Sequence, residues 1–227
     1  MDLGNAVAVV TGANRGLGRH LAGQLVRRGA KVYAGARRPE SVDLPGVVPL
    51  RIDVTDEESV RAAAAIASDA TLLINNAGVS TGAGLLEGDL EAVRREMETN
   101  FFGPLTVTRA FAQVIEHNGG GTVFNVLSVL SWWHPAGLGS YAASKAAAWA
   151  QTNAVREELE PRGITVSALH VGLMETDMAA GMPADKTDPA EVAAQVLAGI
   201  ESGATEVLGD RTTRDVRRGL GSVPATA

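Results

Sequence analysis

Tyr141 and Lys145 stand four residues apart in the segment YAASK, and together they could move a proton. The segment is rich in alanine and favours a helix, on which four-residue spacing places both side chains on one face. A free tyrosine has a pKa of about 10, and a neighbouring ammonium in a partly dry cleft lowers it. The pair therefore predicts general acid chemistry by Tyr141 near neutral pH. The alternative is an ordinary pair on a helix surface, so the prediction depends on the surroundings.

Two more polar side chains are candidates for the same site. Ser128 ends the β-rich run TVFNVLS, 13 residues before Tyr141, and its hydroxyl could donate to a substrate oxygen that gains negative charge. Ser131 is the competing serine, but it lies further into the following loop. Asn100 lies in a long helical pattern, in METNFFG, where an isolated asparagine would bond to its own backbone.

A glycine-rich segment, TGANRGLG, runs from Thr11 to Gly18 between a β-rich run and a helical pattern. Glycines in this place let the backbone turn tightly and approach a pyrophosphate, whose charge the helix N-terminus stabilises. The spacing differs from the G-x-G-x-x-G of the commonest dinucleotide fold, so a plain connection is the alternative. The segment predicts the phosphate site of a dinucleotide cofactor.

The end of the second β-rich run, KVYAGARR, bears on the choice of cofactor. A free ribose prefers a carboxylate at this point, whereas a 2′-phosphate needs basic partners. Ala36 offers no carboxylate, Arg37 follows it, and Arg15 comes from the glycine-rich segment. This pattern favours NADP(H), as NADPH or NADP+, over NAD(H). The alternative is that Arg37 and Arg38 are solvated surface charges.

The elements that must position these residues alternate along the chain. Short β-rich apolar runs predict seven strands, at residues 6–10, 31–34, 47–52, 72–75, 122–127, 164–170 and 206–208. Helical patterns lie between them, at residues 16–28, 56–67, 90–116, 141–160 and 189–201. The alternation predicts a doubly wound, Rossmann-like α/β fold, with helices on both faces of a mostly parallel seven-stranded sheet.

Length and composition restrict the class of protein. The 227 residues contain no Pro/Gly/Ser-rich linker and predict a single domain over residues 1–227. A net charge of −6 gives no reason to expect nucleic acid or a membrane surface as a partner, and no apolar run approaches the roughly 20 residues of a membrane span. Without cysteine and with four scattered histidines, no metal site is expected. The opening segment MDLGNAVAVVTG lacks a secretory pattern, which predicts a cytoplasmic protein.

Taken together, these motifs resemble those of the short-chain dehydrogenase/reductase family. TGANRGLG matches the pattern TGxxxGxG, residues 75–78 read NNAG after the fourth predicted strand, and Tyr141 and Lys145 supply YxxxK. The resemblance extends over nearly all 227 residues. It implies a catalytic tetrad of Asn100, Ser128, Tyr141 and Lys145. In the family the asparagine of this tetrad holds a water against the lysine.

The resemblance also implies which residues bind the cofactor. Asp53 and Val54 match the family's adenine contact, and Asn76 is expected beside the cofactor, whereas Asn75 is expected to brace the sheet edge. The full expected set is Gly12, Asn14, Arg15, Gly16, Leu17, Gly18, Arg37, Asp53, Val54, Asn76, Ala77, Gly78, Tyr141, Lys145, Gly172 and Thr176.

One departure from the family pattern follows the sixth predicted strand. The family's PGxxxT reads VGLMET here, so Val171 replaces the proline and removes a rigid backbone constraint from the nicotinamide pocket. Gly172 and Thr176 are retained, and Thr176 is expected to bind the nicotinamide carboxamide.

Loops at the carboxyl ends of the strands are expected to hold the substrate, at residues 79–88, 129–139 and 173–187. In the middle loop, Trp132 and Trp133 could wall a pocket for a flat or apolar substrate, or one of them could pack on the core. His134 is expected at the rim and not in catalysis. Val79 and Met174 complete the expected pocket. The short last loop predicts an accessible, permissive site.

The function expected is NADP(H)-dependent hydride transfer between nicotinamide and a carbonyl or secondary alcohol, with ketone reduction as the main direction. The alternatives are a non-catalytic NADP(H)-binding regulator, an NAD-dependent alcohol dehydrogenase, and an epimerase or dehydratase of the kind that carries an added substrate domain. Family members commonly pair through the helices that correspond to residues 90–116 and 141–160, so a homodimer or homotetramer is expected. The polar tail at residues 211–227 is expected to be flexible.

Overall fold

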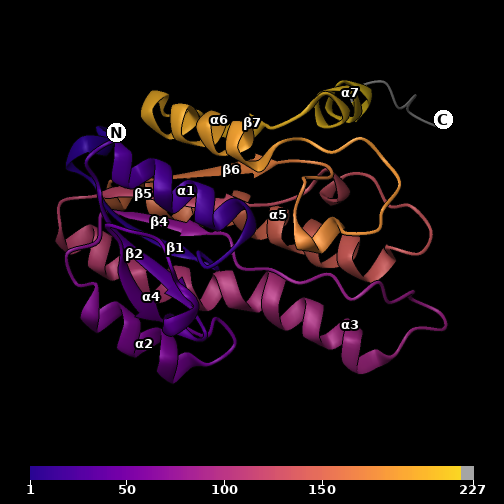
Figure 1. The fold of residues 1–227 in the computed structure, drawn as a ribbon, viewed down its shortest axis with the longest axis horizontal. Helices are drawn as coiled ribbons and strands as arrows, with labels where there is room; N and C mark the ends of the chain where they lie inside the picture. Colours follow the sequence, from indigo (N-terminus) through magenta and orange to yellow (C-terminus); the bar gives the residue numbers. More distant parts are fainter. Residues whose placement is uncertain (221–227) are drawn as a thin grey trace.

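This computed structural model describes residues 1–220, whose strands form one parallel sheet. The strands lie in the order β3-β2-β1-β4-β5-β6-β7, and every adjacent pair is parallel (Figure 1). Their bounds are β1 Val7–Thr11, β2 Lys31–Ala36, β3 Val48–Arg51, β4 Leu72–Asn75, β5 Gly121–Val126, β6 Ile164–His170 and β7 Glu206–Leu208. The predicted seven-stranded sheet is confirmed.

The middle of the sheet is buried from both sides. Ala8, Val9 and Val10 of β1 have no exposed surface. Val9 belongs to the apolar core on one face, whereas Ala8 and Val10 belong to the core on the other, because alternate residues of a strand point to opposite faces. This double burial is why the strands read as continuous apolar runs.

Helices cover both faces of the sheet, which confirms the doubly wound fold (Figure 1). Their bounds are α1 Gly16–Arg27, α2 Glu57–Ile66, α3 Leu90–Met97, α4 Gly103–His117, α5 Gly139–Leu159, α6 Pro189–Ser202 and α7 Arg211–Gly219. Residues of α1 and α6 share one core, and residues of α2 and α4 share the core of the opposite face. Within residues 1–220, no helix is both long and apolar enough to cross a membrane.

Aspartate side chains fix the starts of several helices. The Asp56 carboxylate accepts from the amides of Glu58 and Ser59 at the start of α2, and Asp188 accepts from the Ala190 amide at the start of α6. These acceptors satisfy amides that the first helical turn leaves unpaired, which stabilises the start by about 1 kcal/mol. Because such caps are visible in the sequence, the predicted and observed starts of α2 and α6 agree within one residue.

The predicted continuous helix at residues 90–116 is wrong in its middle. The structure contains α3, a π-helical turn at Glu98–Phe102, and then α4. Pro104 in the first turn of α4 has no N–H to donate to the Asn100 carbonyl, so the regular bond across this point is lost. Such π turns occur mostly at functional sites, and this one carries Asn100.

The structure also differs from the expected flexible tail after residue 210, because Arg211–Gly219 form α7. Asp210 caps this helix by accepting from the Thr213 amide at 2.7 Å, and Thr213 itself is fully buried. Val216 packs against an apolar cluster that includes Leu130. Few side chains of α7 face inward, and so its polar sequence resembles a loop. Residues 221–227 of the expected tail lie outside the described residues.

His170, the last residue of β6, is fully buried in a stack of side chains. Its ring centre lies 3.8 Å from that of Trp132, and the Arg217 guanidinium lies 5.1 Å from the same indole. Arg217 also pairs with Glu206 of β7 at 3.0 Å. Burial lowers the pKa of His170 to about 4, although a hydrogen bond to the Ser128 carbonyl opposes the shift. The stack holds α7 against the loop that follows β5.

The environment of His170 predicts a loss of stability in acid. The unfolded chain protonates this ring near pH 6.5, whereas the folded chain does so only near pH 4. Because the unfolded state binds more protons between these values, the free energy of unfolding falls as the pH drops through that window, by about 3 kcal/mol in all. Urea unfolding at about pH 7 and at about pH 4.5, two conditions that together cover most of this window, measures the loss.

His170→Gln should lose less stability than the wild type between those two conditions, since glutamine does not titrate. His117→Gln, which changes an exposed histidine on α4, should lose as much as the wild type. Equal acid losses in wild type and His170→Gln would contradict the assignment.

Candidate active site

The residues that could do chemistry meet at the carboxyl end of the sheet, beside the point where the strand order reverses between β1 and β4. The connections leaving these two strands diverge, which opens a crevice in folds of this kind. β1 ends in the glycine-rich turn, β4 leads into Asn76, and β5 leads to Ser128. The first two turns of α5 supply Tyr141 and Lys145.

Lys145 is buried, and its ammonium is held at the end of β5. Nζ donates to the Val126 carbonyl oxygen at 2.9 Å and lies 5.7 Å from the centre of the Tyr141 ring. A Cβ on Gly78 would lie 3.7 Å from Nζ, so the NNAG segment passes close by. A buried cation needs a partner of this kind. Burial also lowers the pKa of Lys145, to about 8.

Ser128 is placed against the Tyr141 side chain by a short helical turn. It caps the 3-10 turn Val129–Ser131 by accepting from the Leu130 amide at 3.1 Å. Because its oxygen accepts this bond, its hydroxyl hydrogen can point into the site, where the Ser128 side chain hydrogen-bonds Tyr141. Ser131, the competing candidate, has a buried hydroxyl with no hydrogen-bond partner.

The pKa of Tyr141 is raised to about 12, mainly by burial. The hydrogen bond with Ser128 lowers this pKa, and the charge of Glu96 raises it. The prediction that Lys145 brings this pKa toward neutrality is wrong: in the structure the pKa stays high. The phenol loses more hydration than an ammonium 5.7 Å from the ring centre compensates. Tyr141 therefore carries its proton at neutral pH.

Asn100 uses its side chain to hold the segment that follows NNAG. Its Oδ1 accepts from the Val79 amide and its Nδ2 donates to the Val79 carbonyl oxygen, both at 2.9 Å. Nδ2 also donates to the Ser144 hydroxyl at 3.0 Å. A cavity of about 10 Å³ is lined by Asn100, Lys145 and Ala77, among others. This space suits about one water molecule, as the expected relay between asparagine and lysine requires.

The glycine-rich turn packs directly against the end of β4. Gly12 has a φ of +66°, and a Cβ on Gly18 would overlap the Gly12 carbonyl oxygen and the Asn76 side chain. Asn76 donates to the carbonyl oxygens of Thr11 and Gly12 at 2.8 and 3.2 Å. The Thr11 hydroxyl in turn accepts from the amides of Asn76 and Ala77, both at 3.0 Å. Protein contacts alone therefore hold the turn in shape.

The N-terminus of α1 fits an anion such as a pyrophosphate. Its cap residue, Arg15, makes no side-chain hydrogen bond to the first turn, and that turn contains no acidic residue. The amides there remain available, and the helix dipole favours negative charge. A Cβ on Gly16 would lie 3.4 Å from Thr176, so the retained threonine faces this turn. Asn14 is half-buried, whereas the Leu17 side chain is buried in the core and leaves only its backbone for a ligand.

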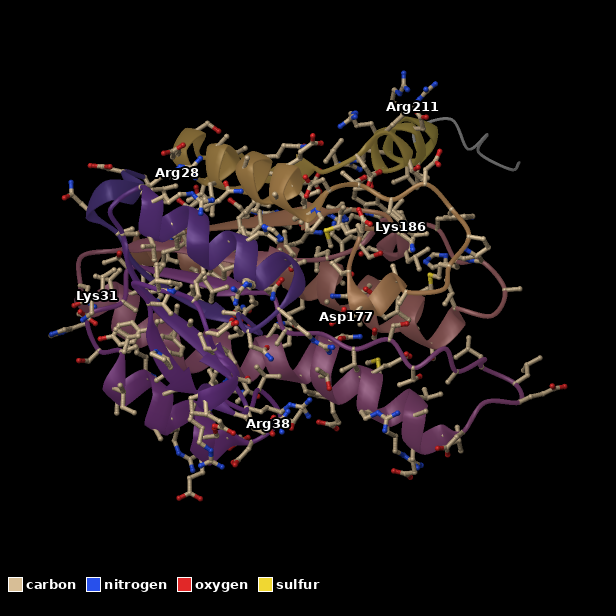
Figure 2. All side chains as sticks on the ribbon, viewed as in Figure 1. Arg28, Lys31, Arg38, Asp177, Lys186 and Arg211 are labelled. Carbon is tan, nitrogen blue, oxygen red and sulfur yellow. The ribbon has the colours of Figure 1, made fainter. Side chains whose placement is uncertain are left out.

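The two arginines expected at the ribose are both exposed in the structure. Arg15 pairs with Asp177 at 3.3 Å, and these side chains are 67% and 74% exposed. Figure 2 shows Asp177 in the loop that follows β6. Arg37 is exposed directly after β2, whose last residue, Ala36, is buried and offers no carboxylate. Since an exposed ion pair contributes little stability, Arg15 can leave Asp177 for a stronger anion.

Asp53 and Val54, the expected adenine contacts, follow β3. The Asp53 carboxylate accepts from the amide and hydroxyl of Thr55 at 3.0 and 2.8 Å. Val54 is buried, and a Cβ on Gly103 would lie 2.9 Å from its side chain. The carboxylate therefore shapes its own turn, and the valine supports the start of α4.

Asn75 braces the sheet, as the sequence analysis expected. Its Nδ2 donates to the Thr108 hydroxyl of α4 at 3.0 Å and to Asn125 of β5 at 2.9 Å. These bonds join β4 to its neighbours below the site and leave the adjacent Asn76 to the glycine-rich turn.

The loop after β6 keeps its place without the family's proline. Val171 is buried, and its carbonyl oxygen accepts from the Val129 amide at 3.0 Å. The Gly172 amide donates to the Asp210 carboxylate, which also caps α7. Packing and a side-chain acceptor thus replace the rigid ring at this point.

The residues expected to line the substrate pocket are divided between core and surface. Trp132 is packed between His170 and Arg217 and is 8% exposed, so it belongs to the core of α7 and is not an open pocket wall. Trp133 is 51% exposed, and His134 is also exposed. Met174 is half-buried and pairs with Thr187 in an isolated bridge, while Val79 is held by Asn100, as described above.

Three residues of the site were not among those predicted from the sequence. Thr11 binds the NNAG segment, Asp210 binds Gly172, and Glu96 is buried close enough to act on Tyr141. Thr11 could have been found, since it opens the same motif. Glu96 stands four residues before Asn100, on the same helical face, which was the available signal for it.

The packing of Gly18 predicts that a single added methyl group weakens cofactor binding. Gly18→Ala should push α1 away from Gly12 and Asn76 and displace the amides that face the pyrophosphate. We expect at least a tenfold weaker Kd for NADPH by fluorescence titration, equal to about 1.4 kcal/mol. Gly84→Ala, where a Cβ meets no atom within 4 Å, is the control and should bind as the wild type does. Unchanged binding by Gly18→Ala would rule out this turn as the cofactor site.

Comparisons with known proteins agree with this geometry. The family model described as short chain dehydrogenase matches residues 6–187. A solved short chain dehydrogenase from Burkholderia cenocepacia, determined in complex with NADP, superposes with a TM-score of 0.94 at 43% identity, over 98% of this chain and 95% of that one.

Two curated relatives are named as reductases. The 3-oxoacyl-(acyl-carrier-protein) reductase of Vibrio cholerae is 32% identical over 219 residues, which cover 86% of this chain and 90% of that protein. The NADPH-dependent 1-acyldihydroxyacetone phosphate reductase of Schizosaccharomyces pombe is 36% identical over 178 residues, which cover 74% of this chain but only 60% of that longer protein. The predicted family and enzyme class are confirmed: this chain is an oxidoreductase and belongs to the short chain dehydrogenase family.

Proposed function

We propose that this chain reduces ketones with NADPH and uses Tyr141 as the proton donor. The observation that carries the proposal is the meeting of Tyr141, Ser128 and Lys145 beside the glycine-rich turn. Family membership supplies the class of reaction, between carbonyl and alcohol. The proposal adds the residues and their roles.

The chain's own groups would hold the cofactor along the crevice. The glycine-rich turn and the N-terminus of α1 would bind the pyrophosphate, and Thr176, which faces that turn, would bind the nicotinamide carboxamide. Bound NADPH would supply the hydride to the carbonyl carbon.

Tyr141 and Ser128 would act on the carbonyl oxygen. Tyr141 carries its proton at neutral pH and would donate it as the oxygen gains negative charge. Ser128 would donate a hydrogen bond to the same oxygen. Ser128 as a whole residue is 6% exposed, so little water competes for that bond, which strengthens it.

Lys145 would stabilise the phenolate that Tyr141 leaves behind. With a pKa of about 8, Lys145 is protonated in most molecules at pH 7. Its positive charge near the ring favours the phenolate. One water in the cavity between Asn100 and Lys145 would return a proton to the pair.

The preference for NADP(H) is supported by charge at the end of β2. Ala36 gives no carboxylate to repel a 2′-phosphate, and Arg37 and Arg15 are exposed and able to reach one. The Burkholderia structure with NADP and the NADPH-dependent yeast enzyme support the same cofactor.

The substrate would be an apolar ketone held at the loops. Each of the three loops presents a large apolar side chain to solvent, namely Leu86 (98% exposed), Trp133 and Met178. Exposed apolar groups gathered near one site mark a binding surface. The names of the two reductase relatives contain acyl substrates, whose carbon chains are apolar and would suit such a surface. Ketones with short carbon chains would bind less well.

Assembly and location follow from the family and are part of the proposal. We expect a homodimer or homotetramer formed through the segment of α3 and α4 and through α5, because α5 is long and rich in small residues that let helices approach closely. The cytoplasm, where NADPH is a reductant, is the expected compartment.

Tyr141→Phe tests the proton donor. With a panel of aliphatic and aromatic ketones, NADPH oxidation by this variant should fall by about 10³-fold in kcat, because the general acid is gone while the packing is kept. Tyr33→Phe, which alters the other tyrosine of the chain on β2, is the control and should keep its activity. NADPH binding without turnover of any ketone or alcohol by the wild type would favour the non-catalytic regulator instead.

Arg37→Ala tests the cofactor preference. Losing one charge-assisted bond to the 2′-phosphate should raise the KM for NADPH about tenfold, and leave the KM for NADH unchanged. Arg61→Ala, at an exposed arginine of α2 that pairs with Glu57, should change neither value. Equal effects of Arg37→Ala on both cofactors would contradict recognition of the phosphate.

A further inference from the structure

Glu96, near the end of α3, has no exposed surface and takes no part in the mechanism above. A carboxylate is costly to bury, and it persists inside a protein where several donors satisfy it. Here the donors come from two segments that both border the site. This arrangement calls for a role beyond filling space, because an apolar side chain would fill the same volume at less cost.

The first donor segment is the loop after β4. The amide and the hydroxyl of Thr81 both donate to Glu96 Oε1, the hydroxyl at 2.8 Å. This loop includes Val79, which Asn100 holds, and it continues to the exposed residue Leu86. Glu96 therefore anchors one wall of the substrate site.

The second donor segment is the start of α5. The Ser140 hydroxyl forms a short hydrogen bond with Glu96 Oε2 and lies 2.9 Å from the Ala83 carbonyl oxygen of the same loop. Ser140 immediately precedes Tyr141 in the sequence. The cap residue of α5, Leu138, makes no side-chain hydrogen bond to the first turn. The start of this helix is thus held from outside, through Ser140.

A close contact between the same two segments supports this arrangement. A Cβ on Gly139 would lie 2.9 Å from the Leu85 side chain, so the loop lies directly on the first turn of α5. Glu96 reaches both segments from α3, and it joins them at the residue before Tyr141.

We propose that Glu96 is a positioning residue that ties the loop after β4 to the start of α5. In this way it fixes the position of Tyr141 and helps to keep the phenol protonated. The inference rests on the proposed function in one respect, that Tyr141 is the proton donor. Glu96 has no exposed surface, so we assign it no direct contact with substrate or cofactor.

Its charge adds to its geometry. The Glu96 carboxylate raises the pKa of Tyr141, in the same direction as burial, whereas the hydrogen bond from Ser128 lowers it. Lys145, on the same helix as Tyr141, is the cation that faces the ring, at 5.7 Å. Glu96 therefore favours the neutral phenol, which keeps its proton until a substrate oxygen takes it.

The first test observes Tyr141 without turnover. The chain contains two tyrosines, so ring-labelled tyrosine gives two NMR signals, and Tyr141→Phe identifies the one of interest. Glu96→Gln keeps the shape but removes the charge, and it should lower the titration midpoint of Tyr141 by about one pH unit. Glu98→Gln, at an exposed glutamate of the π turn, makes the same change of charge and should leave the midpoint in place. Equal midpoints in Glu96→Gln and the wild type would overturn the electrostatic part.

The second test separates position from charge. Ser140→Ala keeps the Glu96 carboxylate but cuts its bond to α5, and it should lower kcat for ketone reduction about tenfold through misplacement of Tyr141. It should leave the Kd for NADPH as in the wild type, because the glycine-rich turn is untouched. Wild-type kcat in Ser140→Ala would overturn the positioning part.

Controls distinguish the possible failures. Circular dichroism and thermal unfolding establish whether each variant is folded. If Glu96→Gln does not fold, Ser140→Ala still tests the positioning role of Glu96. If Tyr141→Phe stays fully active, the proposed function fails, although the NMR shift can still appear. If Tyr141→Phe is inactive while both Glu96→Gln and Ser140→Ala match the wild type, only the role of Glu96 fails.

Discussion

A cation taken out of water at the end of the sheet is the constraint on which the rest of the site depends. The Lys145 ammonium is buried, and it has the Val126 carbonyl oxygen for a partner because β5 ends just there. α5 must lie against that strand end, and Gly78 passes beside the ammonium, where a Cβ would lie 3.7 Å from it and 3.2 Å from Asn100 Oδ1. The π turn then brings the Asn100 side chain to the same level. Sheet, helix and loops are thus fitted around one charge.

Much of this arrangement was accessible from the sequence, for identifiable physical reasons. Strands buried on both faces have largely apolar sequences, and so β4 and β6 were located to the residue, as was the short, half-buried edge strand β7. Aspartate caps predicted where α2 and α6 begin. The glycine-rich turn, NNAG and YxxxK are local patterns, and parallel strands bring their carboxyl ends to one edge. Local signals combined with that topology were enough to predict the family and the meeting of the tetrad.

The rest depends on contacts that no local pattern records. α7 looks like a loop because Thr213 and Val216 alone give little apolar periodicity, and its partners come from β7 and from the loops that follow β5 and β6. Trp132 and Trp133 are adjacent and chemically alike, yet one stacks on His170 and the other faces solvent. The high pKa of Tyr141 arises from burial and from Glu96, which is distant in sequence. Energies set by desolvation need the finished fold before they can be assigned.

The attachment of α7 connects this helix with Ser128, the proposed hydrogen-bond donor to the substrate. Arg217 covers Trp132, Trp132 covers His170, and the His170 ring contacts the carbonyl oxygen of Ser128, while Asp210 at the base of the helix holds Gly172. The last described helix therefore contacts both the loop that bears Ser128 and the loop that bears Thr176, and it holds them together. For protein engineering, α7 is a place from which the shape of the pocket can be adjusted at a distance, with the four residues of the tetrad left untouched.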